Sequence, residues 1–247
     1  MQTLIVTGAA RGIGAAVARL GAARGYAVAV NYQTDEPAAR SLVRAIEEAG
    51  GQAIAVRADV ADESAVTELF ATAERDLGKL TALVNNAGIT GSLGRLEDLQ
   101  AGELARVLAV NVAGTLLCAR EAVRRMSTRH GGAGGAIVNV SSLAAKLGGG
   151  GEWVHYAASK GAIDTFTVGL AREVAAEGIR VNAVAPGLIA TGLHAAAGAP
   201  DRLQRLSPGV PLQRAGSPEE VAEAILWLLS PAASYVTGAI LPVGGGR

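Results

Sequence analysis

Tyr156 and Lys160 stand four residues apart in the stretch VHYAASKG, residues 154–161. The small residues around them favour a helix, and residues four apart lie on one face of a helix. A free phenol has a pKa of ~10 and gives up its proton poorly near neutral pH. A nearby ammonium favours the phenolate and lowers that pKa, so the pair could transfer a proton to or from a substrate. An ordinary surface pair is the alternative interpretation.

A glycine-rich turn, TGAARGIG, follows the first apolar run and opens a helical pattern. Gly8 permits a tight turn. Gly12 and Gly14 let the backbone and the helix N-terminus approach a pyrophosphate, whose charge the helix dipole favours. The spacing differs from the G-x-G-x-x-G pattern of many dinucleotide-binding turns. Tight packing without a ligand is therefore the alternative to a phosphate site.

Two further motifs end apolar runs of the chain. Asp59, in RADV, could accept a hydrogen bond from an adenine amino group or could cap the following turn, and by itself the cap is favoured. In NNAG, Asn85 and Asn86 could brace neighbouring strands, while Ala87 and Gly88 leave room for a ribose. Ligands of open α/β sheets bind at the carboxyl ends of the strands, where all three motifs are expected to meet. This shared placement favours a nucleotide site.

Two other stretches of the sequence carry polar residues that could take part in chemistry. Asn111 lies within VLAVNVAGTLL, an apolar helical pattern, where an unpaired amide would cost stability. A satisfied core amide and a member of a proton relay are equally open for this residue. VNVSS places Ser141 and Ser142 at the end of another apolar run. Ser142 could hold a carbonyl oxygen that Tyr156 protonates.

The elements that must position these residues follow a repeating pattern. Most apolar runs are apolar on both faces, as in strands that are covered on both sides of a parallel sheet. Repeated strand–helix units imply one α/β domain, doubly wound, with a mostly parallel sheet of about seven strands. The expected strands cover 3–8, 26–32, 52–60, 82–88, 135–142, 179–187 and 239–244. The expected helices lie near 12–24, 37–49, 62–77, 100–128, 154–177 and 218–229.

The last of these helices has a readable start, because SPEE places Ser217 at the N-cap and Glu220 three positions later, which is a capping box. The whole chain, 1–247, is expected to form one domain. Only about 188–216 lacks a clear pattern, and a loop of that length is usually a lid or a binding segment.

The composition excludes several classes of protein. Lys and Arg total 22 and Asp and Glu total 22, which gives no electrostatic case for nucleic acid or an anionic membrane. Cys118 is the only cysteine, so an internal disulfide is impossible, and a reducing compartment is the simplest interpretation. His130 and His194 share no metal-ligand spacing, so we expect no metal site. We expect a soluble cytoplasmic protein.

The motifs TGAARGIG, NNAG and YAASK, with Asn111 and Ser142 in order between them, resemble the short-chain dehydrogenase/reductase family. The resemblance spans nearly the whole chain and points to the single-domain branch of 3-oxoacyl-carrier-protein reductases and glucose dehydrogenases. It implies a Rossmann-type oxidoreductase domain whose catalytic tetrad is Asn111, Ser142, Tyr156 and Lys160. It also implies a set of cofactor-binding positions: Gly8, Arg11, Gly12, Ile13, Gly14, Tyr32, Asp59, Val60, Asn85, Ala87, Gly88, Tyr156, Lys160, Pro186, Gly187, Ile189 and Thr191.

The end of the second expected strand indicates whether NAD(H) or NADP(H) is the preferred cofactor. Enzymes that prefer NAD usually carry a carboxylate there, which binds the ribose hydroxyls. The corresponding residue in this chain is Tyr32, and its neighbours Asn31 and Gln33 are also neutral. Arg11, in the glycine turn, could pair with a 2′-phosphate. We therefore expect NADP(H) to be preferred over NAD(H).

The sequence predicts an NADP(H)-dependent oxidoreductase that acts on a small-molecule carbonyl or secondary alcohol, with Tyr156 as general acid/base. The rivals are a catalytically silent nucleotide-binding scaffold and a dehydratase or epimerase on the same fold. The resemblance implies a homotetramer, for which the helices 100–128 and 154–177 and the apolar segment 224–229 could supply faces.

Overall fold

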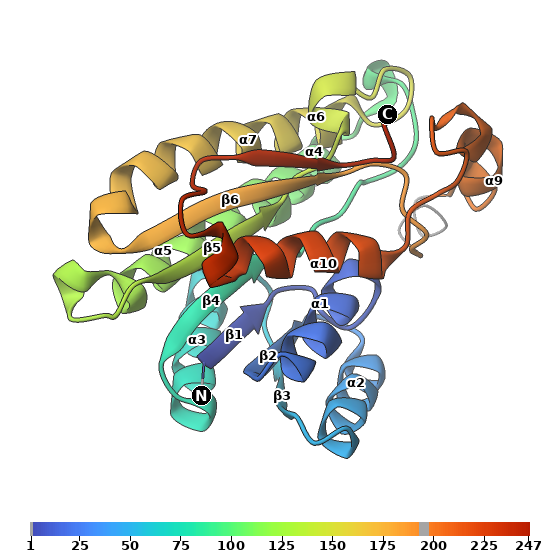
Figure 1. Cartoon of the computed structure of the whole chain (residues 1–247). Helices are drawn as coiled ribbons and strands as arrows, with labels where there is room; N and C mark the ends of the chain where they lie inside the picture. The colour runs from blue at the N-terminus through green and yellow to red at the C-terminus, as the bar shows by residue number, and fades with distance from the viewer. Residues whose placement is uncertain (1, 193–197) are drawn as a thin grey trace.

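A single open sheet forms the centre of the chain, in a computed structural model that describes residues 2–192 and 198–247 (Figure 1). Its strands lie in the order β3-β2-β1-β4-β5-β6-β7, and every neighbouring pair is parallel. The seven expected strands are therefore confirmed, and the sheet is parallel throughout rather than mostly parallel. The bounds are β1 (Gln2–Val6), β2 (Tyr26–Tyr32), β3 (Gln52–Arg57), β4 (Leu80–Asn85), β5 (Gly135–Val140), β6 (Ile179–Pro186) and β7 (Ile240–Val243).

Helices cover both faces of this sheet. Figure 1 shows α1 and α10 side by side on one face, with α5 and α7 on the other. Alternate residues of one strand supply the two cores, because Leu4 and Val6 pack into the first and Ile5 into the second. The helices are α1 (Gly12–Ala23), α2 (Glu36–Glu48), α3 (Glu63–Leu77), α4 (Ala101–Leu108), α5 (Thr115–Met126), α6 (Ala144–Leu147), α7 (Val154–Val174), α9 (Arg202–Leu206) and α10 (Pro218–Leu229).

Side-chain caps fix where several helices begin. The predicted capping box of α10 is present: Ser217 Oγ accepts a hydrogen bond from the Glu220 backbone N–H, and the Glu220 carboxylate accepts one from the Ser217 N–H. Asp35 caps α2 and Asp62 caps α3 in the same sense.

The expected helix 100–128 is continuous but changes its winding in the middle. A π-helical segment, η2 (Ala109–Gly114), joins α4 to α5 and contains Asn111. In the described part of the chain, Ala101–Met126 is the one helix that is long and apolar enough to cross a bilayer, with a mean hydropathy of 1.4. Its α5 portion packs on β4 and α3, and η2 packs on α7, so it forms part of the layer that covers the sheet.

The segment expected to lack regular structure, about 188–216, has short elements in its described part. Ile189 pairs with Gly216 in an isolated parallel bridge, which brings the two ends of the segment together. Between them lie α9 and the 3₁₀ turn η5 (Ser207–Gly209). Residues 193–197, including His194, fall outside the described residues.

Candidate active site

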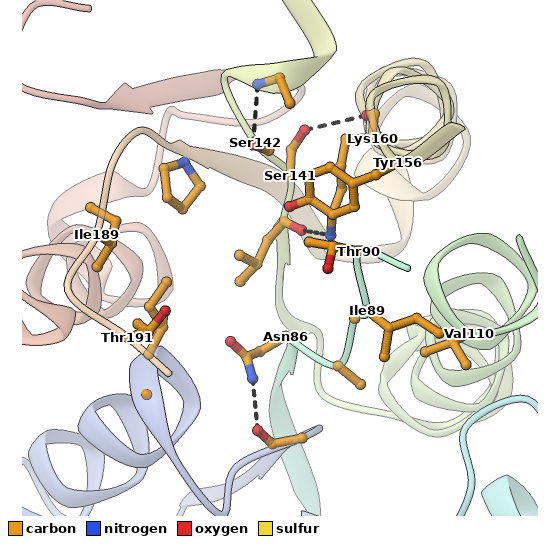
Figure 2. A pocket seen from close by; sticks show the side chains of 18 of the residues that line it. Asn86, Ile89, Thr90, Val110, Ser141, Ser142, Tyr156, Lys160, Ile189 and Thr191 are labelled. Atoms are coloured by element: carbon orange, nitrogen blue, oxygen red, sulfur yellow. Dashed lines mark hydrogen bonds between the residues drawn. The ribbon is translucent and has the colours of Figure 1, made fainter. Parts of the chain in front are cut away.

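A cavity of about 610 Å³ opens at the carboxyl ends of the strands, between the glycine turn and the start of α7. Figure 2 shows Ser142, Tyr156 and Lys160 at one side of this cavity and Asn86 and Thr191 at another. Most of the predicted site residues line it: Gly8, Arg11, Gly12, Ile13, Tyr32, Asp59, Val60, Ala87, Gly88, Ser142, Tyr156, Lys160, Pro186, Gly187, Ile189 and Thr191. The residues that line the cavity do not include Gly14, Asn85 and Asn111. These three have separate packing roles next to the cavity.

The glycine turn is too tight for side chains. Gly8 has φ of +60°, and a Cβ on it would lie 2.9 Å from Ala87 Cα. Gly12 has φ of +58° and faces Thr191 Cγ2, which a Cβ would approach to 3.4 Å. A Cβ on Gly14 would lie 2.8 Å from the Gly8 carbonyl oxygen, so Gly14 serves the packing of α1 against the turn. The turn therefore leaves open backbone at the N-terminus of α1, which suits a pyrophosphate.

Both asparagines of NNAG brace neighbouring strands, but only Asn86 lines the cavity. Neighbouring residues of a strand point to opposite sides. Asn85 points into the core, where its Nδ2 donates to Asn139 Oδ1 at 2.9 Å. Asn86 lines the cavity, and its Nδ2 donates to the carbonyl oxygens of Thr7 (2.8 Å) and Gly8 (3.0 Å). The structure thus gives Asn86, rather than Asn85, the place on the wall, and its amide ties the end of β4 to the glycine turn.

Asn111 is fully buried, and its amide is satisfied. Its Nδ2 donates to the Ile89 carbonyl (2.8 Å) and to Ser159 Oγ (3.0 Å), and its Oδ1 accepts from the Ile89 N–H (2.9 Å). Of the two interpretations left open by the sequence, this arrangement favours the satisfied amide for the side chain. It braces the segment after β4 against α7, next to the residues that face the cavity. The surrounding π-helical winding is a feature often found at functional sites.

Tyr156 and Lys160 lie on one face of α7, as the spacing predicted. Lys160 Nζ is 5.7 Å from the centroid of the Tyr156 ring and donates to the Val140 carbonyl at 2.7 Å. Burial lowers the pKa of Lys160 to about 8, against the opposing charge of Asp164. Lys160 therefore loses its charge as the pH rises through about 8. A Cβ on Gly88 would come within 3.4 Å of Nζ, so that glycine leaves the ammonium open to a cofactor ribose.

The pKa of Tyr156 moves opposite to our expectation from the Tyr156/Lys160 pair. Burial raises the pKa of the phenol, and a hydrogen bond with the Ser142 side chain opposes that rise. Desolvation of the phenolate outweighs the effect of that hydrogen bond. The Ser142 hydroxyl accepts from the Ala144 N–H at 3.1 Å, which fixes it beside the phenol. Ser141 is directed elsewhere, since its hydroxyl donates to Asp164 Oδ1 at 2.5 Å.

The end of the cavity beside β2 and β3 combines predicted and unpredicted residues. Tyr32 ends β2 and is buried. Asp59 both caps its turn, through the Ala61 N–H at 3.0 Å, and accepts from Gln33 Nε2 at 2.8 Å. Arg106, from α4, forms an ion pair with Asp59 at 2.9 Å. No local sequence pattern predicts this contact, because 47 residues separate Arg106 from Asp59.

Comparisons with known proteins match the whole of this architecture. The family model described as enoyl-(acyl carrier protein) reductase matches residues 8–247. The chain is 53% identical over 247 residues to the uncharacterized oxidoreductase YgfF of Escherichia coli (strain K12), covering 100% of both chains. It is 44% identical over 245 residues to the cis-4-hydroxycyclohexanecarboxylate dehydrogenase of Sinomonas cyclohexanicum, covering 99% of this chain and 96% of that relative. The chain belongs to the short-chain dehydrogenase/reductase family. It is an oxidoreductase of that family.

Solved structures share the fold of this short-chain dehydrogenase/reductase. A 7α-hydroxysteroid dehydrogenase, complexed with NADH and 7-oxo glycochenodeoxycholic acid, has a TM-score of 0.91 and 34% identity, covering 99% of this chain and 93% of that one. A blue fluorescent protein from a metagenomic library, in complex with NADPH, has a TM-score of 0.90 and 35% identity, covering 99% and 97%. The fold thus binds nicotinamide cofactors.

Several side chains of this short-chain dehydrogenase/reductase have surroundings that the sequence did not predict. His155 is buried, and its Nε2 lies 2.9 Å from the Thr90 carbonyl oxygen. Arg125 pairs with the buried Glu121. Cys118 is a buried core residue, and burial raises the pKa of its thiol to about 12. Within the described ranges, no three His, Cys, Asp or Glu side chains gather as a metal site.

The part of the cavity lined by the segment after β5 is called its substrate half below. Apolar walls come from Leu143, Ala144 and Leu147, at and just after the end of β5. Three charged side chains also line the cavity here: Glu152, Arg202 and Arg247. Only the fold brings these residues together, since they come from three separate segments of the chain.

Proposed function

We propose that this short-chain dehydrogenase/reductase interconverts a carbonyl and a secondary alcohol, with NADP(H) as cofactor and Tyr156 as general acid/base. The observation that carries the proposal is one continuous cavity that joins the glycine turn to Ser142, Tyr156 and Lys160. The absent side chains of Gly8, Gly12 and Gly88 leave the space that a dinucleotide requires, and Lys160 faces that space.

The residues of the chain divide the reaction between them. When bound, the nicotinamide supplies the hydride for the carbonyl carbon. The Tyr156 hydroxyl donates a proton to the carbonyl oxygen as negative charge develops on it, and Ser142 Oγ holds that oxygen in place. The Lys160 ammonium stabilises the phenolate left on Tyr156, and its hydrogen bond to the Val140 carbonyl keeps it in place. In the oxidative direction the same groups work in reverse.

A small-molecule substrate fits the apolar walls beside Tyr156. The relative from Sinomonas cyclohexanicum, by its name, oxidises a cyclic secondary alcohol, which supports a secondary alcohol or ketone as the reacting group. The lid expected at about 188–216 covers such a substrate in this proposal through its described parts, 188–192 and 198–216, since Ile189 and Arg202 both line the cavity. The balanced charge and single buried thiol agree with a cytoplasmic enzyme.

The proposed reaction is tested by a panel of ketones and secondary alcohols. Purified protein is mixed with NADPH and ketones, or with NADP and alcohols, and the change in reduced cofactor is followed together with the product. We expect turnover of at least one ketone–alcohol pair in both directions. Tight cofactor binding without turnover on any member would favour the silent scaffold, and product formed without net cofactor oxidation would favour a dehydratase or epimerase.

We also propose a homotetramer, because two separate faces expose large apolar side chains. Leu104, Leu108 and Leu116 are exposed on α4 and α5, and Trp227 is exposed on α10. Two distinct self-complementary faces generate a closed tetramer with two-fold axes. Light scattering at micromolar concentration is expected to give a four-chain mass, and the Trp227→Glu variant a two-chain mass. A one-chain mass for the parent protein would contradict the proposal.

A further inference from the structure

Arg202 is a buried cation in the substrate half of the cavity. It begins α9 and is 8% exposed. Its guanidinium lies 4.7 Å from the centroid of the Trp153 ring, and its Nη1 pairs with the Glu152 carboxylate. The Trp153 indole N–H donates to the Gly91 carbonyl at 3.2 Å, which fixes the ring under the guanidinium. The charged group is therefore held in place by neighbouring residues before any substrate arrives.

The hydrogen bonding of this guanidinium is incomplete. Nη1 binds Glu152, but the buried Nε has no acceptor among the described residues. A buried donor without an acceptor costs free energy, so such groups usually mark a place that something else fills. Nε and Nη2 form one edge of the guanidinium fork, and a carboxylate pairs with such an edge through two parallel hydrogen bonds. Glu152 does not occupy this edge of the Arg202 guanidinium, so the edge suits an anionic group.

The surrounding charges decide between an anionic and a cationic ligand. The Glu152 carboxylate is already paired with cationic side chains. The hydrogen bond from Arg202 and the charges of Arg202, Arg205 and Arg247 hold the pKa of this carboxyl below its usual range. A substrate ammonium would find this carboxylate occupied and three guanidinium groups nearby. Asp201 forms an ion pair with only one of these guanidinium groups, that of Arg205, whose Nε lies 3.8 Å from Asp201 Oδ2. An incoming carboxylate meets an incompletely bonded cation instead.

We propose that Arg202 binds a carboxylate on the substrate, at the end remote from the carbonyl that Tyr156 protonates. The proposal rests on the reaction proposed above and specifies its substrate class as oxo acids and hydroxy acids. Trp153 is the N-cap of α7 and lies three residues before Tyr156, so the anchor sits near the start of the helix that carries the reacting group. The apolar side chains of Leu143, Ala144 and Leu147 line the same half of the cavity and suit a hydrocarbon spacer between the two groups.

The test compares methyl-ketone acids of increasing chain length, 4-oxopentanoate, 5-oxohexanoate and 6-oxoheptanoate, each with its neutral methyl ester. At the best length, the parent enzyme is expected to favour the acid over its ester by at least ~10-fold in kcat/KM, which corresponds to ~1.4 kcal/mol. Arg202→Met is expected to remove that preference, and Arg202→Lys to keep part of it. Glu152→Gln is expected to strengthen it, because it releases Nη1. Arg205→Met is the matched control, since Arg205 lies on the same helix but is 54% exposed, and it is expected to keep the preference.

Binding without turnover gives a second readout. Calorimetry on the enzyme with bound NADP is expected to detect binding of hexanoate to the parent protein and no binding to Arg202→Met. Hexan-1-ol, which has the same number of carbons but no carboxylate, measures the contribution of the hydrocarbon chain to binding. Esters reduced as well as their acids at every length would overturn the carboxylate site and leave the proposed reaction standing. An equal loss of both substrates in Arg202→Met would show that Arg202 only fastens α9 to the rest of the protein. No turnover of any ketone, with hexanoate still bound through Arg202, would overturn the reaction but keep the site.

Discussion

Replacing Tyr156 with phenylalanine is expected to lower kcat for ketone reduction by ~10²-fold or more, the range typical of a lost general acid. The substitution removes only the hydroxyl, which meets Ser142 and the substrate oxygen in our account. The ring stays in place over Lys160, so the fold and the cofactor site should survive. Steady-state kinetics with the best ketone of the panel, together with NADPH titration, measures both parts of this expectation.

The chain offers a matched control for this substitution. Tyr235 is fully exposed and lies outside the cavity, so Tyr235→Phe removes a hydroxyl without touching the site. It is expected to keep parental kcat. A Tyr156→Phe enzyme that turned over at a rate near that of Tyr235→Phe would refute the role given to Tyr156. Loss of NADPH binding in Tyr156→Phe would instead place Tyr156 in cofactor binding alone.

The second large effect concerns the choice of cofactor. We expect NADPH to exceed NADH by at least ~10-fold in kcat/KM, which needs ~1.4 kcal/mol. The neutral Tyr32 ends β2 at the place where a carboxylate would repel a 2′-phosphate. Asp35 also lines this part of the cavity, but its carboxylate caps α2 through the Ala38 N–H at 3.1 Å. Arg11 is exposed at the glycine turn and supplies a guanidinium that can pair with the phosphate.

Tyr32→Asp should erase or reverse this preference, because it places a negative charge beside the 2′-phosphate. Tyr32→Asn is the matched control, since the Asn side chain has the same size as that of Asp without its charge. This variant is expected to retain the preference for NADPH over NADH. Kinetics with both cofactors at a fixed ketone concentration measures the ratio for each variant. Equal use of both cofactors by the parent enzyme, or an unchanged ratio in Tyr32→Asp, would mean that the 2′-phosphate is recognised elsewhere or not at all.

The fold could be predicted from the sequence because its signals are local. Apolar runs without alternation predicted strands covered on both faces, and all seven are present. Ser217 and Glu220 predicted the start of α10 from a spacing of three. The shared face of Tyr156 and Lys160 followed in the same way from a spacing of four. Each of these predictions depends only on the period of a helix or a strand.

Details of the site that depend on packing between distant segments could not be predicted. The alternation of a strand says that Asn85 and Asn86 point opposite ways, but not which of them faces the cavity. The spacing of Tyr156 and Lys160 gave their common face, but not the burial that raises the pKa of the phenol. Two contacts of the site join residues that are about 50 positions apart in the sequence, so no local pattern predicts them. These contacts are the ion pair of Arg106 with Asp59 and the stacking of Arg202 on Trp153.

The central claim is direct hydride transfer between NADP(H) and a substrate carbonyl carbon in this cavity, with the proton from Tyr156. The most direct test uses NADPH that carries deuterium at the transferring position of C4 and a ketone that the enzyme reduces, with the alcohol analysed by mass spectrometry and NMR. Our account predicts one deuterium per molecule of alcohol, bound to the carbinol carbon, and a loss of this product in Tyr156→Phe. Alcohol that forms without deuterium at that carbon, or at an undiminished rate in Tyr156→Phe, would contradict it.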